Sequence, residues 1–338
     1  MQEERPPALG FDRTGGLATG TAKADSGLRI AAYLSVKDES EIIAHTIAHL
    51  RAIGIDYIIA CDISSTDGTT DLLRAYESDD FKLVTMSDDA VGNQVPTDDT
   101  WFEQSFRQFR DAPADWIIFL DADEFWLPAS GNLKTCSALR AADIVKVKRL
   151  NIVLGPEGPL MPRTLTPQHY DEVLLYAETI ANNRQGMKRG DNASWIRGAV
   201  MPKIMARRGR IRGLTPGMHD AVVQEGDDIR RAVAEDLVVA HLPLSTIERF
   251  AVKVKNVRGI YEREGIDLSA AGETWAEYGT AWHWRRWAGI GSPTELAQEF
   301  GSNVLMPERM TELLRAGTVR SAYDVLASAA LGDGRPEG

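Results

Sequence analysis

Short apolar runs alternate with helical patterns through the first third of the chain. Residues 28–36, 57–60 and 81–86 are apolar runs of strand length. Apolar residues at helical spacing follow the first run up to about residue 53, and follow the second over residues 69–77. Strands and helices that alternate at this spacing imply right-handed crossovers and a parallel sheet. The sequence therefore predicts an α/β fold with a mostly parallel sheet flanked by helices.

Acidic residues stand where the predicted strands end. They are Asp38 and Glu39 after the first strand, Asp62 after the second, and Asp121, Asp123 and Glu124 after the apolar run that starts at Asp115. Because the carboxyl ends of parallel strands share one edge, where open α/β sheets bind ligands, we expect these acids to converge. Two aspartates one residue apart need a partner for their charge, and a hard divalent cation is the usual one. The alternatives are an acidic surface turn at Asp121 and Asp123, and helix capping by Asp38 and Asp67.

Composition excludes several function classes. The chain has 338 residues, a net charge of −11 and a pI near 5.1. The negative charge argues against sequence-independent binding to nucleic acid phosphates. Its two cysteines lack metal-ligand spacing and favour a reducing compartment. The amino-terminal residues are acidic and polar rather than basic and then apolar, and no run is long enough to span a membrane. We expect a cytoplasmic protein and leave open a peripheral contact with the inner membrane face.

Three motifs in order carry a resemblance to a known family. Val36 to Glu39, Asp62 to Thr69 and Phe119 to Phe125 are similar to the motifs of family 2-like nucleotide-sugar glycosyltransferases, which have the GT-A fold. The likeness covers roughly the first half of the chain and extends to the soluble branch whose third motif reads D-x-D-E. It departs from that branch at Asp38, where Asn is usual. The resemblance implies a Mn²⁺- or Mg²⁺-dependent transfer from a nucleoside-diphosphate sugar.

The same resemblance implies roles for the matched acids. Asp62 would hydrogen-bond the nucleobase, Asp38 and Glu39 would lie at the donor site, and Asp121 would lie near the ribose and the metal. Asp123 would ligate the metal, which would neutralise charge on the leaving diphosphate.

Histidines late in the catalytic domain often complete the metal site in GT-A enzymes. His219 is our candidate ligand, and His241 is the second choice. A histidine that ends an apolar strand is also often a hydrogen-bonded core residue, so both interpretations remain open.

An inverting transfer needs a general base that deprotonates the acceptor hydroxyl. Asp220, Glu124 and Asp191 are candidates in that order, and spacing does not choose among them. Two rival functions remain: a nucleotide-sugar-binding protein without turnover, and a D-x-D phosphatase. The phosphatase is disfavoured because Glu124-Phe125 follows the motif where Gly-Thr would be expected.

The rest of the chain divides by composition. We predict a flexible arm over 1–27, a GT-A catalytic domain over 28–244, a helical region over 245–331 and a tail over 332–338. Residues 144–153 and 195–206 are predicted as further strands.

A Trp-rich segment, 273–288, fits packing on the sheet, an acceptor platform or a membrane contact. The basic cluster over 207–212 fits phosphate binding or an ordinary turn equally well. The acceptor is expected to be a saccharide or glycolipid, as in polysaccharide biosynthesis.

Overall fold

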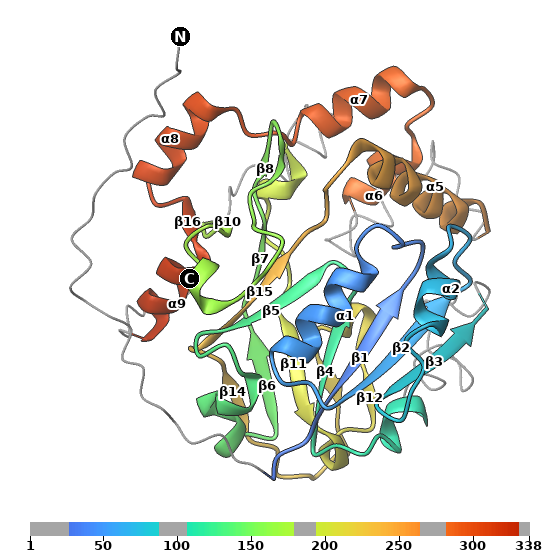
Figure 1. Cartoon of the computed structure of the whole chain (residues 1–338), viewed down its shortest axis with the longest axis vertical. Coiled ribbons are helices and arrows are strands. Elements are labelled where there is room, and N and C mark those ends of the chain that lie inside the picture. The colour runs from blue at the N-terminus through green and yellow to red at the C-terminus, as the bar shows by residue number, and fades with distance from the viewer. Residues whose placement is uncertain (1–26, 88–106, 179–193, 264–281, 331–338) are drawn as a thin grey trace.

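The structure is a computed structural model, and it describes residues 27–87, 107–178, 194–263 and 282–330 (Figure 1). The predicted arm, the tail and Asp191 lie outside the described residues.

A seven-stranded sheet forms the centre of the fold, in the order β14-β6-β11-β4-β1-β2-β3. Its strands are β1 (Ile30–Val36), β2 (Tyr57–Ile63), β3 (Phe81–Met86), β4 (Trp116–Asp121), β6 (Ile144–Val147), β11 (Lys203–Arg207) and β14 (Arg231–Val233). Neighbouring strands pair in parallel except that β11 runs antiparallel to both β4 and β6. The prediction of a mostly parallel sheet flanked by helices is confirmed.

Both faces of the sheet are buried at its central strands β1 and β4. Helix α1 (Ile43–Ala52) follows β1, and helix α2 (Thr69–Arg74) follows β2. Because side chains alternate along a strand, Ala32 and Leu34 of β1 pack with the buried side of α1, while Tyr33 packs against Phe109 on the opposite face. Burial on both faces explains why β1 reads as a continuous apolar run.

A second, three-stranded sheet adjoins the first. It has the order β5-β15-β7 and consists of β5 (Glu124–Pro128), β15 (Leu237–His241) and β7 (Arg149–Asn151). Only Ala122 and Asp123 separate the end of β4 from the start of β5. The D-x-D-E stretch therefore lies at the junction of the two sheets.

The C-terminal part is mainly helical, as predicted. Its helices are α5 (Ile247–Arg263), α6 (Trp282–Ala288), α7 (Pro293–Gly301), α8 (Pro307–Arg315) and α9 (Ala322–Ala330). Shorter strands are β8 (Leu154–Gly155), β9 (Gly158–Pro159), β10 (Leu174–Tyr176), β12 (Gly213–Leu214), β13 (Ala221–Val222) and β16 (Val319–Ser321). Figure 1 shows α5 beyond the carboxyl ends of β1 and β2, where Arg249 of α5 pairs with Glu39. This helix therefore borders the acidic edge of the sheet.

Two predicted strands differ in the structure. Residues 195–206 form a 3₁₀ turn, Trp195–Arg197, and only then β11, because Gly198 and Pro202 interrupt regular pairing. Residues 144–153 are not one half-solvated strand: the chain leaves β6 for β7 at Lys148, so this segment contributes to both sheets.

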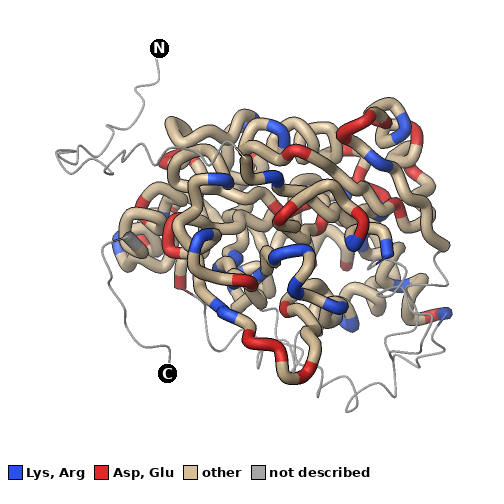
Figure 2. The backbone as a smooth tube through the Cα atoms, turned by 90° about the horizontal axis from the view of Figure 1, so that it is seen from below, with Lys and Arg blue, Asp and Glu red and all other residues tan. Residues whose placement is uncertain are grey.

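Among the described residues, no helix is both long and apolar enough to cross a membrane. Acidic and basic residues are interspersed along the chain in Figure 2 rather than separated onto opposite sides.

Candidate active site

The last residue of β4, Asp121, faces the solvent at the sheet junction. Its side chain is 43% exposed, and Oδ2 accepts a hydrogen bond from Lys203 Nζ at 2.8 Å. Lys203 lies on the neighbouring antiparallel strand β11 and is itself fully buried. Burying an ammonium costs free energy unless carboxylates pair with it. Lys203 therefore needs Asp121 as a partner, and this ion pair fixes the Asp121 side chain at this edge of the sheet.

Glu124 is the buried member of the acidic stretch. It is fully buried and pairs with Arg149 Nη1 at 2.6 Å and with Lys203 Nζ at 3.1 Å. It also accepts a hydrogen bond from the backbone N–H of Asp121, which shapes the turn between the sheets. Burial raises the pKa of Glu124, while Lys203 and Arg149 oppose that shift. These contacts hold Glu124 in the interior, where it bonds to the backbone of the turn between the two sheets.

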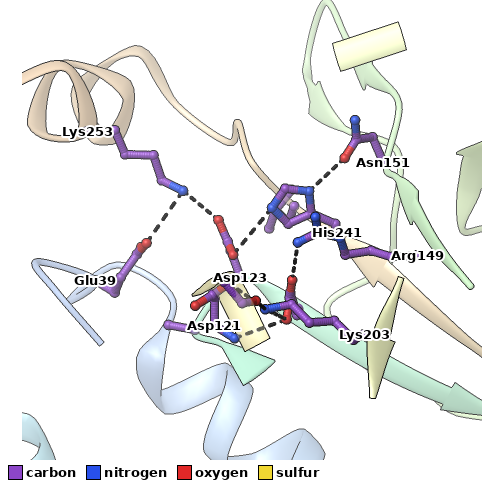
Figure 3. A network of polar contacts seen from close by, with 12 residues as sticks. Glu39, Asp121, Asp123, Arg149, Asn151, Lys203, His241 and Lys253 are labelled. Carbon is purple, nitrogen blue, oxygen red and sulfur yellow. Dashed lines mark hydrogen bonds and ion pairs between the residues drawn. The ribbon is translucent and has the colours of Figure 1, made fainter. Parts of the chain in front are cut away.

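Asp123 is surrounded by cations from α5. Its Oδ2 atom lies 2.5 Å from Lys253 Nζ and 3.3 Å from Arg249 Nη2 (Figure 3). Burial raises the pKa of its carboxyl, but Lys253 and Arg249 outweigh burial and hold the pKa well below its usual range. Asp123 is therefore an anion at neutral pH.

The other oxygen of Asp123 faces His241. Nε2 of His241 lies 3.6 Å from Oδ1, because antiparallel pairing of β15 with β5 sets His241 opposite Glu124. Burial keeps the pKa of His241 well below its usual range, so the ring is neutral. Asn151 Nδ2 donates to the carbonyl of Ile196, which orients the Asn151 oxygen toward His241 Nδ1 at 2.6 Å. The single ring proton is thus on Nδ1, and Nε2 presents a lone pair to the carboxylate.

Two acceptors that face each other without a proton between them fit a cation. Among the described residues, no three His, Cys, Asp or Glu side chains form a ready-made metal site. Mg²⁺ and similar hard ions bind through one or two carboxylates together with substrate phosphates and water rather than through complete protein cages. Asp123 and His241 therefore fit an ion that a diphosphate ligand would help to hold.

The loops after β1 and β2 are bonded to each other. Asp38 adopts a positive φ of 51° and accepts from the Thr66 backbone N–H at 2.5 Å, so it bridges the two loops and does not cap α1. Asp67 lies one residue before Gly68, the N-cap of α2, and accepts from the backbone N–H of Thr69, the first residue of that helix. Asp62 is buried and accepts from Ser65 N–H and from the Thr70 hydroxyl. These bonds order the edge where the predicted nucleobase contact lies.

Glu39 connects this edge to α5. Both of its carboxylate oxygens accept from Arg249, at 2.6 and 3.0 Å. Bidentate pairing of this kind fixes geometry as well as charge. Glu39 therefore positions α5, and with it the cations that reach Asp123.

His219 and Asp220 have partners other than Asp123 and His241, although His219 lies close enough to Asp121, Lys203 and Arg149 for their charges to affect its pKa. His219 Nδ1 bonds to the Pro202 carbonyl at 2.9 Å, and burial lowers the pKa of His219 to about 4. Asp220 pairs with Arg231 at 2.6 Å and with Lys146 at 3.3 Å. The second-choice histidine, His241, is the one that faces Asp123.

Five polar residues of this site were not predicted from the sequence as site residues. They are Arg149, Asn151, Lys203, Arg249 and Lys253. The basic cluster over 207–212, in contrast, begins opposite Trp116, at the amino end of β4. Its arginines bond to Asp143 and to nearby carbonyls, so this cluster serves the edge opposite the acids.

The described part of the Trp-rich segment packs inside the protein. Trp287 is 3% exposed and contacts Phe250 of α5 and Trp195 edge to face. Trp195 also stacks on His283. Packing is therefore the role that these contacts support.

No protein-family model matches the chain. No curated protein matches it either. Among solved structures, it is similar to glucosyl-3-phosphoglycerate synthase from Mycobacterium tuberculosis in complex with Mn²⁺, UDP and glucosyl-3-phosphoglycerate, with 16% identity, 76% of this chain and 88% of that chain covered, and a TM-score of 0.33. A complex of that synthase with Mg²⁺ and UDP gives 16% identity, 72% and 82% coverage, and a TM-score of 0.31.

Proposed function

We propose that this chain is a metal-dependent glycosyltransferase that uses a nucleoside-diphosphate sugar. The observation that carries the proposal is the pair formed by Asp123 and His241 at the carboxyl end of β4, where two acceptors lie 3.6 Å apart. This is the edge at which open α/β sheets bind ligands. The motifs that lead into this edge are those of nucleotide-sugar glycosyltransferases, which supports the same assignment.

Asp123 and His241 would hold Mn²⁺ or Mg²⁺, with Asp121 exposed beside them. When bound, the metal supplies Lewis-acid stabilisation of the negative charge on the leaving diphosphate. Asn151 keeps the His241 lone pair directed at the site by accepting the Nδ1 proton. Asp62 would select the nucleobase at the end of β2.

The acceptor side of the site rests on the motif resemblance. We propose a saccharide or glycolipid acceptor, met in the cytoplasm or at the inner membrane face, as in polysaccharide biosynthesis. Asp220 remains the proposed general base, and its present partners Arg231 and Lys146 would have to give way to an acceptor hydroxyl.

A thermal-shift experiment tests the donor site. Unfolding is followed with UDP, GDP and their sugars, each with Mn²⁺ or with EDTA. A ligand at about 100 times its Kd stabilises by about 2.7 kcal/mol, so one nucleotide series should raise Tm by several degrees with Mn²⁺ only. Asp123→Asn should lose this response, whereas the control Asp71→Asn, an exposed acid on α2, should keep it.

Two further outcomes decide between the proposal and its rivals. No metal-dependent response to any nucleotide would refute the donor site. A response without release of the free nucleotide from any nucleotide sugar, over a panel of acceptors, would instead indicate a binding protein.

A further inference from the structure

Lys253 reaches the D-x-D stretch from a distant part of the chain. It lies on α5, and its ammonium is 2.5 Å from Asp123 Oδ2 and 3.6 Å from Glu39 Oε1. Figure 3 shows Lys253 on the side of Asp123 that faces away from His241. The carboxylate of Asp123 is thus shared between an internal ammonium and the predicted metal position.

The two α5 cations at Asp123 differ in how firmly they are held. Arg249 is 2% exposed and has three other hydrogen bonds, two to Glu39 and one to the Leu242 carbonyl. Lys253 is 20% exposed and has a flexible four-carbon stem. Lys253 is therefore the cation that can leave Asp123 without breaking the anchor of α5.

Charge balance indicates when Lys253 would leave. The ion pairs that join Glu39, Asp123 and Glu124 link four carboxylates with four basic side chains: Glu39, Asp121, Asp123 and Glu124 with Arg149, Lys203, Arg249 and Lys253. A divalent cation alone would add uncompensated positive charge to this site. A divalent cation together with a diphosphate would preserve the balance, because the diphosphate supplies the matching negative charge.

We propose that Lys253 occupies Asp123 in the unliganded protein and transfers its ammonium to the donor diphosphate as the metal arrives. This inference rests on the proposed function and adds to it a coupling between the binding of the metal and the binding of the nucleotide. Metal binding is weak while Lys253 holds Asp123, and the diphosphate strengthens it by giving Lys253 another anion. Since such coupling is reciprocal, the metal strengthens nucleotide binding by the same factor.

Binding measurements on the folded protein test this role without turnover. Free Mn²⁺ is measured by electron paramagnetic resonance in titrations of the wild type and Lys253→Met, each with and without UDP or GDP. Without nucleotide, Lys253→Met should bind Mn²⁺ roughly tenfold more tightly than the wild type, within the usual range of coupling energies. The affinity of Lys253→Met for the nucleotide in the presence of Mn²⁺ should fall by a similar factor, because the diphosphate no longer has the Lys253 ammonium as a partner.

Lys255→Met is the matched control, because Lys255 is an exposed lysine on the same helix. It should behave as the wild type. Lys253→Gln provides a second variant if the methionine protein is poorly folded, which circular dichroism would show. An unchanged or weaker Mn²⁺ affinity in folded, nucleotide-free Lys253 variants would overturn the inference while the wild type still binds nucleotide with Mn²⁺. If the wild type shows no Mn²⁺-dependent nucleotide binding, the proposed function itself fails, and the inference fails with it.

Discussion

Nε2 of His241 and Oδ1 of Asp123 face each other at 3.6 Å although 118 positions separate them in the sequence (241 − 123). Their meeting depends on β15, which pairs with β5 directly after the acidic turn. The register of that pairing, rather than any local motif, brings His241, the second-choice histidine, to Asp123.

Asn151→Ala should weaken Mn²⁺ binding by about 10- to 100-fold, the usual effect of removing the partner that orients a metal-binding histidine. The reason is that the variant removes the acceptor that keeps the His241 proton on Nδ1. Asn151→Asp retains an acceptor and should retain more of the affinity. Isothermal titration with Mn²⁺ and nucleotide checks both variants, and equal losses in the two would refute the orienting role.

The buried contacts of Glu124 lead to a stability prediction. Lys203→Met leaves Glu124 with Arg149 alone and deprives Asp121 of its partner, so it should destabilise the fold by about 3–5 kcal/mol. Urea unfolding measures the change. Combining it with Glu124→Gln should recover part of the loss, because the second change neutralises the carboxylate that was left short of a cation. A double variant whose loss equals the sum of the single losses would contradict this coupling.

The positions of the acids could be predicted because strand ends are local features. An apolar run that ends in Asp121 indicates both the strand and the edge to which its carboxylates belong. Their partners could not be predicted in this way. Lys203, Arg149 and Lys253 reach the acids through β11, β7 and α5, and that pairing depends on tertiary structure for which no periodicity in the sequence gives a signal.

The choice between His219 and His241 shows the same limit. His241 ends a short apolar strand and His219 follows a Pro-Gly turn, and only the antiparallel pairing of β15 with β5 shows that His241 is the one that faces Asp123. Gly198 and Pro202 explain why the predicted strand over 195–206 is shorter than its apolar content indicates. The sequence shows which residues can pair but does not show to which sheet each short strand belongs.

Arg212→Ala should leave the metal-dependent nucleotide response unchanged. Arg212 is exposed, bonds to Gln224 and follows the strand end opposite the acids. Despite its dense positive charge, the basic cluster therefore lies at the edge of the sheet opposite Asp121 and Asp123. Thermal shift with Mn²⁺ and nucleotide checks the variant. Loss of the response would show that the basic cluster contributes to donor binding.

His49 should make the stability of the fold depend on pH. Its Nε2–H donates to the Trp126 carbonyl at 2.8 Å, and burial lowers its pKa from 6.5 to about 4. Between these values the unfolded chain binds a proton that the folded protein does not, so the free energy of unfolding falls as pH drops from about 6.5 to about 4. One unit of pKa shift corresponds to about 1.4 kcal/mol, so the loss from this residue approaches roughly 3 kcal/mol.

His49→Gln keeps a hydrogen-bond donor for Trp126 but cannot titrate, so its urea midpoint should change less steeply over that pH range. Burial also lowers the pKa values of His45, His219 and His241, so these histidines should leave the variant with more than half of the wild-type slope. Unfolding curves at half-unit steps from pH 4 to pH 7 measure both slopes. Identical slopes would show that His49 takes up its proton in the folded protein without penalty, and the buried, neutral imidazole inferred from its contacts would then be wrong.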